Sequence, residues 1–195
     1  MASFRNIAGD SYFRFNYEND YFAATDRDYT QGYSFEVVTP WLSKNPINKL
    51  FLKAKDSRQK YGLAIEHNGY TPYRYESDQI QYGDRPFAAA IMLKSFKIST
   101  DTITKSRISS ALNVGLIGPV AFGGEMQTAI HEATGNDIPQ GWQYQIKNDI
   151  VLNYEINYEQ QLLRFQNYFL LQGNGRLRLG TLNTDASVGI ATMIG

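Results

Sequence analysis

Two histidines, His67 and His131, are the side chains of this sequence best suited to proton transfer near neutral pH. Gln127 precedes His131 by four residues, so on a helix the two side chains share one face, one turn apart. A neutral imidazole held on a short helix is able to take a proton from water as a general base. A histidine taken alone is more often an ordinary packed or surface residue, so both interpretations stay open at this point.

Near the N-terminus, a second polar group offers oxygen ligands. Asn19 and Asp20 are followed by Asp26, Asp28 and Thr30. Amide, carboxylate and hydroxyl oxygens are hard ligands that suit calcium. The spacing is not that of an EF-hand loop, and on spacing alone a polar hairpin loop held by side-chain-to-backbone hydrogen bonds is favoured.

Other routes to catalysis are absent from the sequence. There are no cysteines, which excludes disulfides, thiolate zinc sites and a cysteine nucleophile. The motifs of serine hydrolases, P-loop proteins, dinucleotide-binding proteins and zinc proteases do not occur. Any enzymatic chemistry therefore falls to the histidines and the oxygen ligands.

The elements that position these residues show the alternation of half-buried strands. In residues 11–20, Phe13, Phe15 and Tyr17 share one parity, whereas Arg14 and Asn16 share the other. Such a period of two predicts a strand with one apolar and one polar face. The same reading predicts about eight strands, over residues 11–20, 29–39, 60–66, 86–98, 107–116, 150–160, 168–182 and 186–195.

Two local signals complete the expected elements. The Asn68–Gly69 pair predicts a turn after the third strand. Residues 124–134 lack alternation, are rich in helix formers and are followed by Gly135, which predicts one short helix of about ten residues with a glycine C-cap.

Composition narrows the class of protein. The chain has 195 residues and a formal net charge of zero, which argues against a nucleic-acid binder. It has 14 Tyr, 11 Phe and 2 Trp, yet its mean hydropathy is −0.40. No apolar run is long enough for a membrane-spanning helix, and residues 1–6 lack the apolar stretch of a signal peptide. Aromatic-rich alternating strands favour an outer-membrane-type antiparallel β-barrel over a soluble sandwich.

Several motifs follow one another along residues 17–150. They comprise Asn19–Asp20, residues 25–32, residues 70–72, residues 83–87, residues 114–119, Gln127 with His131, and Gly141–Trp142 with Gln145. Taken together, they resemble the lipid A 3-O-deacylase family of Gram-negative outer membranes. The set is specific as an ordered series, although no single motif would be. The part after residue 150 resembles the family only as barrel-like strands.

The resemblance implies a twelve-stranded outer-membrane barrel with its active site at the extracellular rim. It implies calcium-dependent hydrolysis of the ester-linked 3-position acyl chain of lipid A. By position, His131 would be the general base, Asn19 and Asp20 would hold the cation, and Thr30 would assist by hydrogen bonding. Gln127 would be a substrate-binding residue one turn before the base.

Two departures from the family pattern affect these expectations. The lysine that some members use after the third strand has no match, and Arg74 is the nearest cation, so Arg74 is expected to bind substrate with a different reach. About eight strands are also fewer than a twelve-stranded barrel needs. We therefore expect residues 1–195 to form a single all-β barrel domain that is incomplete at its C-terminal end.

The expected function is that of an outer-membrane hydrolase of a Gram-negative bacterium, with Ca²⁺ as cofactor and lipid A or lipopolysaccharide as substrate. Its other expected partner is outer-membrane lipid; we expect a monomer that binds no nucleic acid. Two alternatives from other classes stay open. One is a non-enzymatic outer-membrane barrel, structural or pore-forming, and the other is a soluble lipocalin-like binder.

Overall fold

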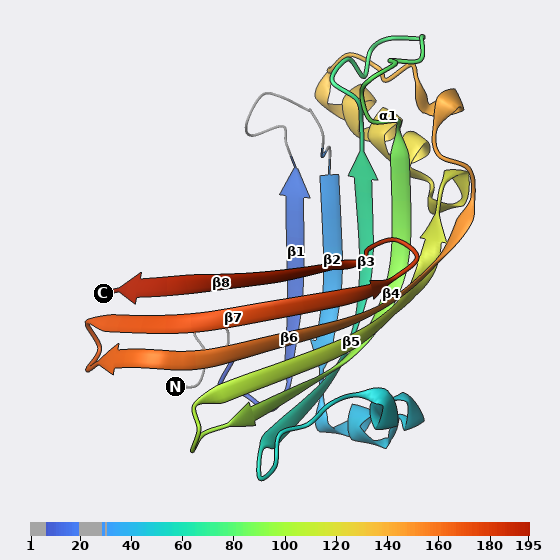
Figure 1. Ribbon diagram of the computed structural model, residues 1–195. Helices are drawn as coiled ribbons and strands as arrows, with labels where there is room; N and C mark the ends of the chain where they lie inside the picture. Colours follow the sequence, from blue (N-terminus) through green and yellow to red (C-terminus); the bar gives the residue numbers. More distant parts are fainter. Residues whose placement is uncertain (1–6, 20–28, 30) are drawn as a thin grey trace.

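The computed structural model describes residues 7–19, 29 and 31–195 and consists of one antiparallel sheet (Figure 1). Its eight strands follow one another in chain order, and each pairs with the next. They are β1 (Tyr12–Asn19), β2 (Gln31–Val38), β3 (Arg58–Tyr70), β4 (Ala88–Asp101), β5 (Ser106–Ile117), β6 (Asp149–Phe165), β7 (Phe169–Gly180) and β8 (Asp185–Ile194). Each of the predicted strands is present, so the all-β antiparallel fold is confirmed.

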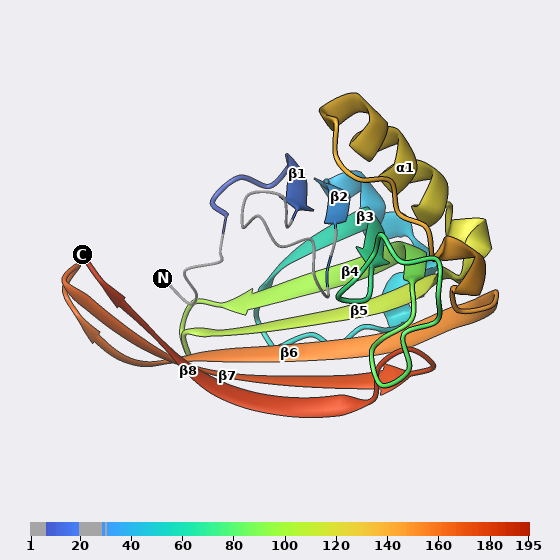
Figure 2. The ribbon, with the colours of Figure 1, turned by 90° about the horizontal axis from the view of Figure 1, so that it is seen from above.

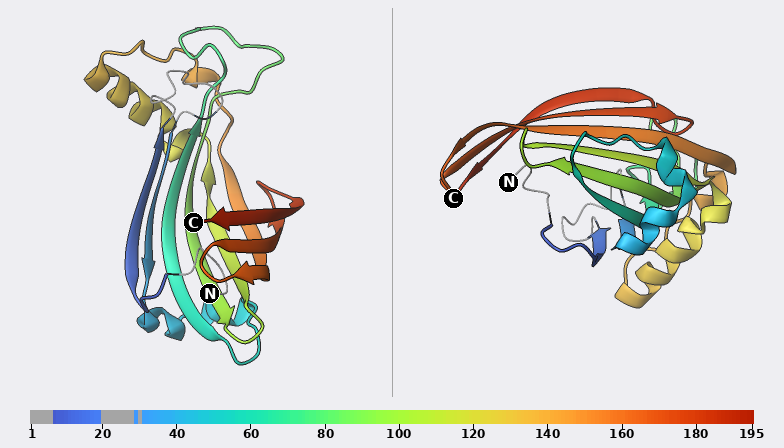
Figure 3. Two further views of the ribbon diagram at one scale, coloured as in Figure 1. Left: turned by 90° about the vertical axis from the view of Figure 1, so that its left-hand side faces the viewer. Right: turned by 90° about the horizontal axis from the view of Figure 1, so that it is seen from below.

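The sheet coils into a curved trough, as the views along its axis show (Figures 2 and 3). In Figure 1, β1 to β4 stand nearly upright, whereas β6 to β8 cross them at a steep angle. Several strands are long: β4 has 14 residues and β6 has 17, against the ~9–11 that a tilted strand needs to cross a bilayer. Among the described residues no pairing joins β8 back to β1, and the prediction of a single domain over residues 1–195 stays a prediction.

The convex outer face of the sheet is apolar and exposed. Large side chains of every strand lie on it, including Phe13, Phe35, Ile65, Leu93, Val114, Leu152, Leu177 and Val188. Cross-strand partners keep the same face because the register aligns them, as in Phe15 with Phe35 and Phe35 with Ile65. An exposed apolar face on this scale is what contact with lipid would cover.

The concave inner face carries ion pairs between neighbouring strands as well as a buried apolar cluster, which consists of Val38, Ala64, Phe96, Ile98 and Ala111. Arg107 Nη1 lies 3.2 Å from Glu159 Oε1, and these two side chains are 10% and 2% exposed. Three further pairs are Arg14 with Glu36, Lys94 with Glu66, and Arg178 with Asp185. The ion pairs thus lie on the inner side of the sheet, on the parity opposite to that of the exposed apolar side chains.

The predicted turn at Asn68–Gly69 is wrong. Both residues lie within β3, where Gly69 is aligned with Gln31 on one side and with Ala89 on the other. An isolated Asn–Gly pair favours a turn, but backbone hydrogen bonds to two flanking strands outweigh that local preference.

The connections differ between the two ends of the sheet. At the lower end of Figure 1, the β2–β3 connection carries the 3₁₀ helices η2 (Pro40–Lys44) and η3 (Pro46–Leu50). At the upper end, residues 118–148 carry η4 (Pro119–Ala121), α1 (Gly123–Thr134) and η5 (Trp142–Tyr144). The helix α1 confirms the predicted one, and Gly135 caps it with a φ of 72°. Within the described part of the chain, no helix is long and apolar enough to cross a membrane.

Candidate functional site

The helix α1 lies outside the trough, against the upper rim of the sheet (Figures 2 and 3). Its buried residues are Gly123, Gln127 and His131, which recur every four positions and so form one face. This confirms the expectation that Gln127 and His131 point the same way. The face with the candidate base therefore packs inward, between the helix and its surroundings at the rim.

Gly123 permits the close approach of α1 to the sheet. A Cβ atom at this position would collide with Ala89 Cβ on β4 and would lie 2.7 Å from Cη2 of Trp142. Any larger residue would push the start of the helix outward, because well-packed contacts leave little room to adjust.

We expect Gly123→Ala to destabilise the docked helix by about 1–3 kcal/mol through overpacking. Thermal unfolding would measure the loss of stability. Gly175→Ala is the matched control, because an added Cβ there meets only Ser187 O, at 3.9 Å; equal losses in the two variants would contradict the docking role of Gly123.

His131 is held in one tautomer by the chain that follows the helix. Its side chain is buried, and its Nδ1 lies 2.6 Å from the carbonyl oxygen of Asp137. A carbonyl only accepts hydrogen bonds, so Nδ1 carries the proton and donates it, which makes Nε2 the basic nitrogen of the neutral ring. The turn at Gly135 brings Asp137 into place, since the N–H of Asn136 donates to His131 O at 3.0 Å.

The β3–β4 loop, residues 71–87, supplies the neighbour of His131. The ring of Tyr75 stands edge-on to the imidazole, with centroids 5.3 Å apart. Arg74, the expected substrate-binding cation, directly precedes Tyr75, is exposed, and lies 3.8 Å from the carboxylate of Glu76. Arg74 thus lies on the same loop as Tyr75, whose ring contacts the candidate base, and the role of Arg74 stays a prediction.

Gln127 holds the segment after α1 against the helix. Its Oε1 accepts a hydrogen bond of 2.8 Å from the indole N–H of Trp142. The Trp142 ring packs on Phe87, the last residue before β4, with centroids 5.0 Å apart. The amide oxygen of Gln127 is therefore engaged with the indole of Trp142. The expected contact of Gln127 with substrate stays a prediction.

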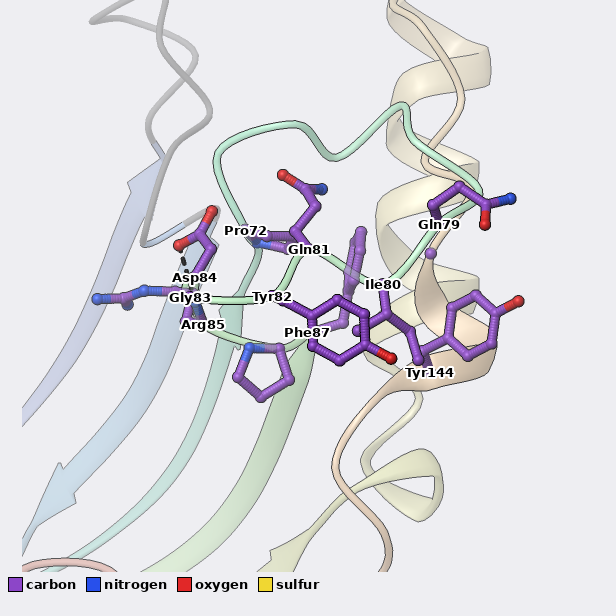
Figure 4. Close-up of a pocket in the computed structure, with 12 residues that line it drawn as sticks. Pro72, Gln79, Ile80, Gln81, Tyr82, Gly83, Asp84, Arg85, Phe87 and Tyr144 are labelled. Carbon is purple, nitrogen blue, oxygen red and sulfur yellow. Dashed lines mark hydrogen bonds between the residues drawn. The ribbon is translucent and has the colours of Figure 1, made fainter.

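A cavity of about 200 Å³ opens beside α1, between the β3–β4 loop and η5 (Figure 4). Phe87 and Gly141 are among the residues that line it. The loop is braced by Asp84, whose carboxylate accepts hydrogen bonds of 2.7 Å from the backbone N–H groups of Tyr73 and Arg85. These bonds favour the charged form and lower the pKa of Asp84.

His67, the other histidine of the chain, lies near the rim on β3. It is fully buried on the outer face of β3, stacked between the rings of Tyr33 at 5.1 Å and Phe122 at 5.0 Å. Its Nε2 lies 2.7 Å from the carbonyl oxygen of Ala121, which ties β3 to the turn that starts α1. One signal was available in the sequence, since His67 has the parity of the apolar residue Ile65.

The expected cation ligands fall mostly outside the described residues. Asp20 and Thr30 lie outside them altogether, and Asn19 is described only as the last backbone position of β1, paired with Gln31. Tyr29, next to Thr30, donates to Oδ1 of Asn68 at 3.5 Å. Burial, followed by the nearby carboxylate of Glu18, raises the pKa of Tyr29. In the described ranges no group of three or more His, Cys, Asp or Glu residues offers a metal site.

Comparisons with known proteins agree with this architecture. The model of the family described as outer membrane protein LpxR matches residues 2–195. No curated protein matches the sequence. Among solved structures, LpxR from Salmonella typhimurium is similar with a TM-score of 0.74 and 19% identity, over 93% of this chain and 62% of that chain. This chain thus spans less than two thirds of that structure, and the likeness shows a shared fold. Because the family model matches nearly every residue, the chain belongs to the family of outer membrane protein LpxR.

Proposed function

We propose that this chain acts in the outer membrane of a Gram-negative bacterium as a hydrolase of lipid A, removing the ester-linked 3-position acyl chain. The observation that carries the proposal is the fixed tautomer of His131, whose Nδ1 donates to the Asp137 carbonyl. The base lies on a helix docked outside the sheet at its rim, above the apolar outer face. A lipid in the surrounding membrane would approach the base from that side.

In the proposed reaction His131 Nε2 removes a proton from a water molecule as the water oxygen attacks the ester carbonyl carbon. The tetrahedral oxyanion then collapses and the bond to the sugar oxygen breaks. The protonated imidazole returns its proton to that oxygen, which leaves a free fatty acid and a 3-hydroxyl group on lipid A. General base catalysis of this kind typically contributes about 10²–10⁴-fold to the rate.

Calcium fits the donor set that the sequence provides. Asn19 and Asp20 would hold the ion through amide and carboxylate oxygens, which calcium prefers, and Thr30 would assist by hydrogen bonding. When bound, the ion would stabilise negative charge on the ester oxygen as a Lewis acid.

Removal of calcium is expected to abolish deacylation. Chelation would take away charge stabilisation worth several kcal/mol, so the rate should fall by at least about 100-fold. Adding back Ca²⁺ should restore it, and Mg²⁺ should restore less because it demands a stricter octahedral geometry. Full activity in chelator would contradict a calcium-dependent mechanism.

Mass spectrometry of purified lipid A tests the proposed activity directly. The chain is folded in detergent with calcium and incubated with lipid A, and the loss of one ester-linked acyl chain is expected. Intact lipid A together with ion conductance in planar bilayers would instead support a non-enzymatic, pore-forming barrel. The soluble lipocalin-like alternative is disfavoured by the exposed apolar outer face, which a soluble protein rarely presents.

A further inference from the structure

The β2–β3 connection is long at an end of the sheet where other connections are short. It spans residues 39–57, whereas the β4–β5 and β6–β7 connections at that end span only 102–105 and 166–168. Figure 1 shows it at the lower rim, opposite the rim that carries α1. Strands at this end of the sheet pair through short turns, so strand pairing does not explain why this connection is long and structured.

Polar contacts fix this connection to the outer face of β4 and β5. Lys97 Nζ donates to Phe51 O at 2.9 Å, and the backbone N–H groups of Leu52 and Ala54 donate to Ser110 Oγ and Ser99 Oγ at 3.0 and 2.9 Å. The outer face thus changes from apolar side chains such as Leu93, higher on β4, to buried polar ones beneath the connection. The connection sits where the apolar band of the barrel ends.

The side chains that the connection turns outward combine three large apolar groups with a cluster of cations. Trp41, Leu50 and Leu52 are 72%, 59% and 46% exposed. The exposed cations are four of the nine lysines of the chain, namely Lys44, Lys49, Lys53 and Lys55. The same connection contains a single acidic residue, Asp56. A fixed segment that exposes both tryptophan and lysine is typical of the boundary between lipid and water.

We propose that residues 40–55 form an interfacial anchor that binds the anionic headgroups of phospholipids at the membrane surface opposite α1. The apolar side chains insert at the level of the headgroups while the lysine ammonium groups pair with phosphates. The charge pattern selects anionic over zwitterionic lipid, because four lysines act together with a single nearby carboxylate. The inference rests on the proposed membrane location, but not on the proposed hydrolysis.

Tryptophan quenching by brominated lipids tests the anchor. The full chain is folded into vesicles that contain either brominated phosphatidylglycerol or brominated phosphatidylcholine, at the same total lipid composition. Trp41→Phe gives the signal of Trp142 alone, which is subtracted. We expect the Trp41 signal to be quenched more strongly by the anionic brominated lipid, with a ratio that falls at high salt because surface charge is screened.

Two matched variants separate charge from packing. Replacing Lys44, Lys49, Lys53 and Lys55 together by Gln should bring the quenching ratio to that of an unselective contact, whereas replacing them together by Arg should preserve it. Equal quenching by the two lipids in the unmodified chain would overturn the proposal. So would an absence of quenching by either, which is the result expected if a protein partner or water covers the segment.

Deacylation of lipid A, measured on the same samples, keeps the two proposals distinct. Selective quenching without deacylation leaves the anchor standing and defeats the proposed hydrolysis. Deacylation without selective quenching supports the proposed hydrolysis and defeats the anchor.

Discussion

Replacing His131 by alanine is expected to lower deacylation of lipid A by about 10²–10⁴-fold, the usual contribution of a general base. The imidazole is buried beside Tyr75 and is oriented by the Asp137 carbonyl, so alanine removes both the basic nitrogen and the contacts that orient it. The measurement is the initial rate of acyl release by mass spectrometry, at saturating calcium.

The neighbouring residue provides the control for this prediction. Glu132 follows His131 on the same helix turn but is exposed, so Glu132→Ala should leave the rate within a few-fold of the unmodified chain. Both variants should show the same strand content and the same migration of the folded form in gels. A His131→Ala protein that keeps more than a tenth of the activity would show that another group accepts the proton.

Replacing Arg107 by alanine is expected to destabilise the sheet by about 3–5 kcal/mol, because it breaks a buried ion pair by removing the cation that lies 3.2 Å from the Glu159 carboxylate. Arg107 lies on β5 and Glu159 on β6, directly opposite each other in the register, and both are buried on the inner face. Guanidinium unfolding of the chain in phospholipid vesicles, followed by tryptophan fluorescence, would measure the loss.

Two comparisons make the Arg107 prediction specific. The double variant Arg107→Ala with Glu159→Ala should recover part of the loss, since it removes the buried carboxylate together with the cation. Arg58→Ala breaks the ion pair between Arg58 and Asp10, two side chains that are each 61% exposed. This variant should change stability little. Similar losses from the buried and exposed pairs would contradict the role assigned to burial.

The sequence by itself determined the strands, the helix and the sharing of faces. Alternation of apolar and polar residues is a local property, and it was strong enough to predict the eight strands, with one apolar and one polar face at the first of them. The spacing of Gln127 and His131, together with Gly135, likewise predicted one helix with both side chains on one face. These features depend on periods of two and of about 3.6 residues, which a sequence displays directly.

Local patterns failed where distant segments compete for the same residues. Asn68 and Gly69 read as a turn, but β2 and β4 supply ladder partners on both sides. The sequence shows no partner for His67, but the rings of Tyr33 and Phe122, from two separate segments, stack on its two sides. In each case the deciding contacts come from residues far away in the chain.

Only the tertiary structure decided how the candidate base is prepared and on which side of the barrel it lies. The proton on Nδ1 follows from the Asp137 carbonyl, whose position depends on the turn after α1. The docking of α1 outside the sheet follows from the fit of Gly123 against Ala89 and Trp142. Periodicity says which face of an element is apolar, whereas packing between elements sets what that face meets, and that is the part of this protein that its sequence alone did not reveal.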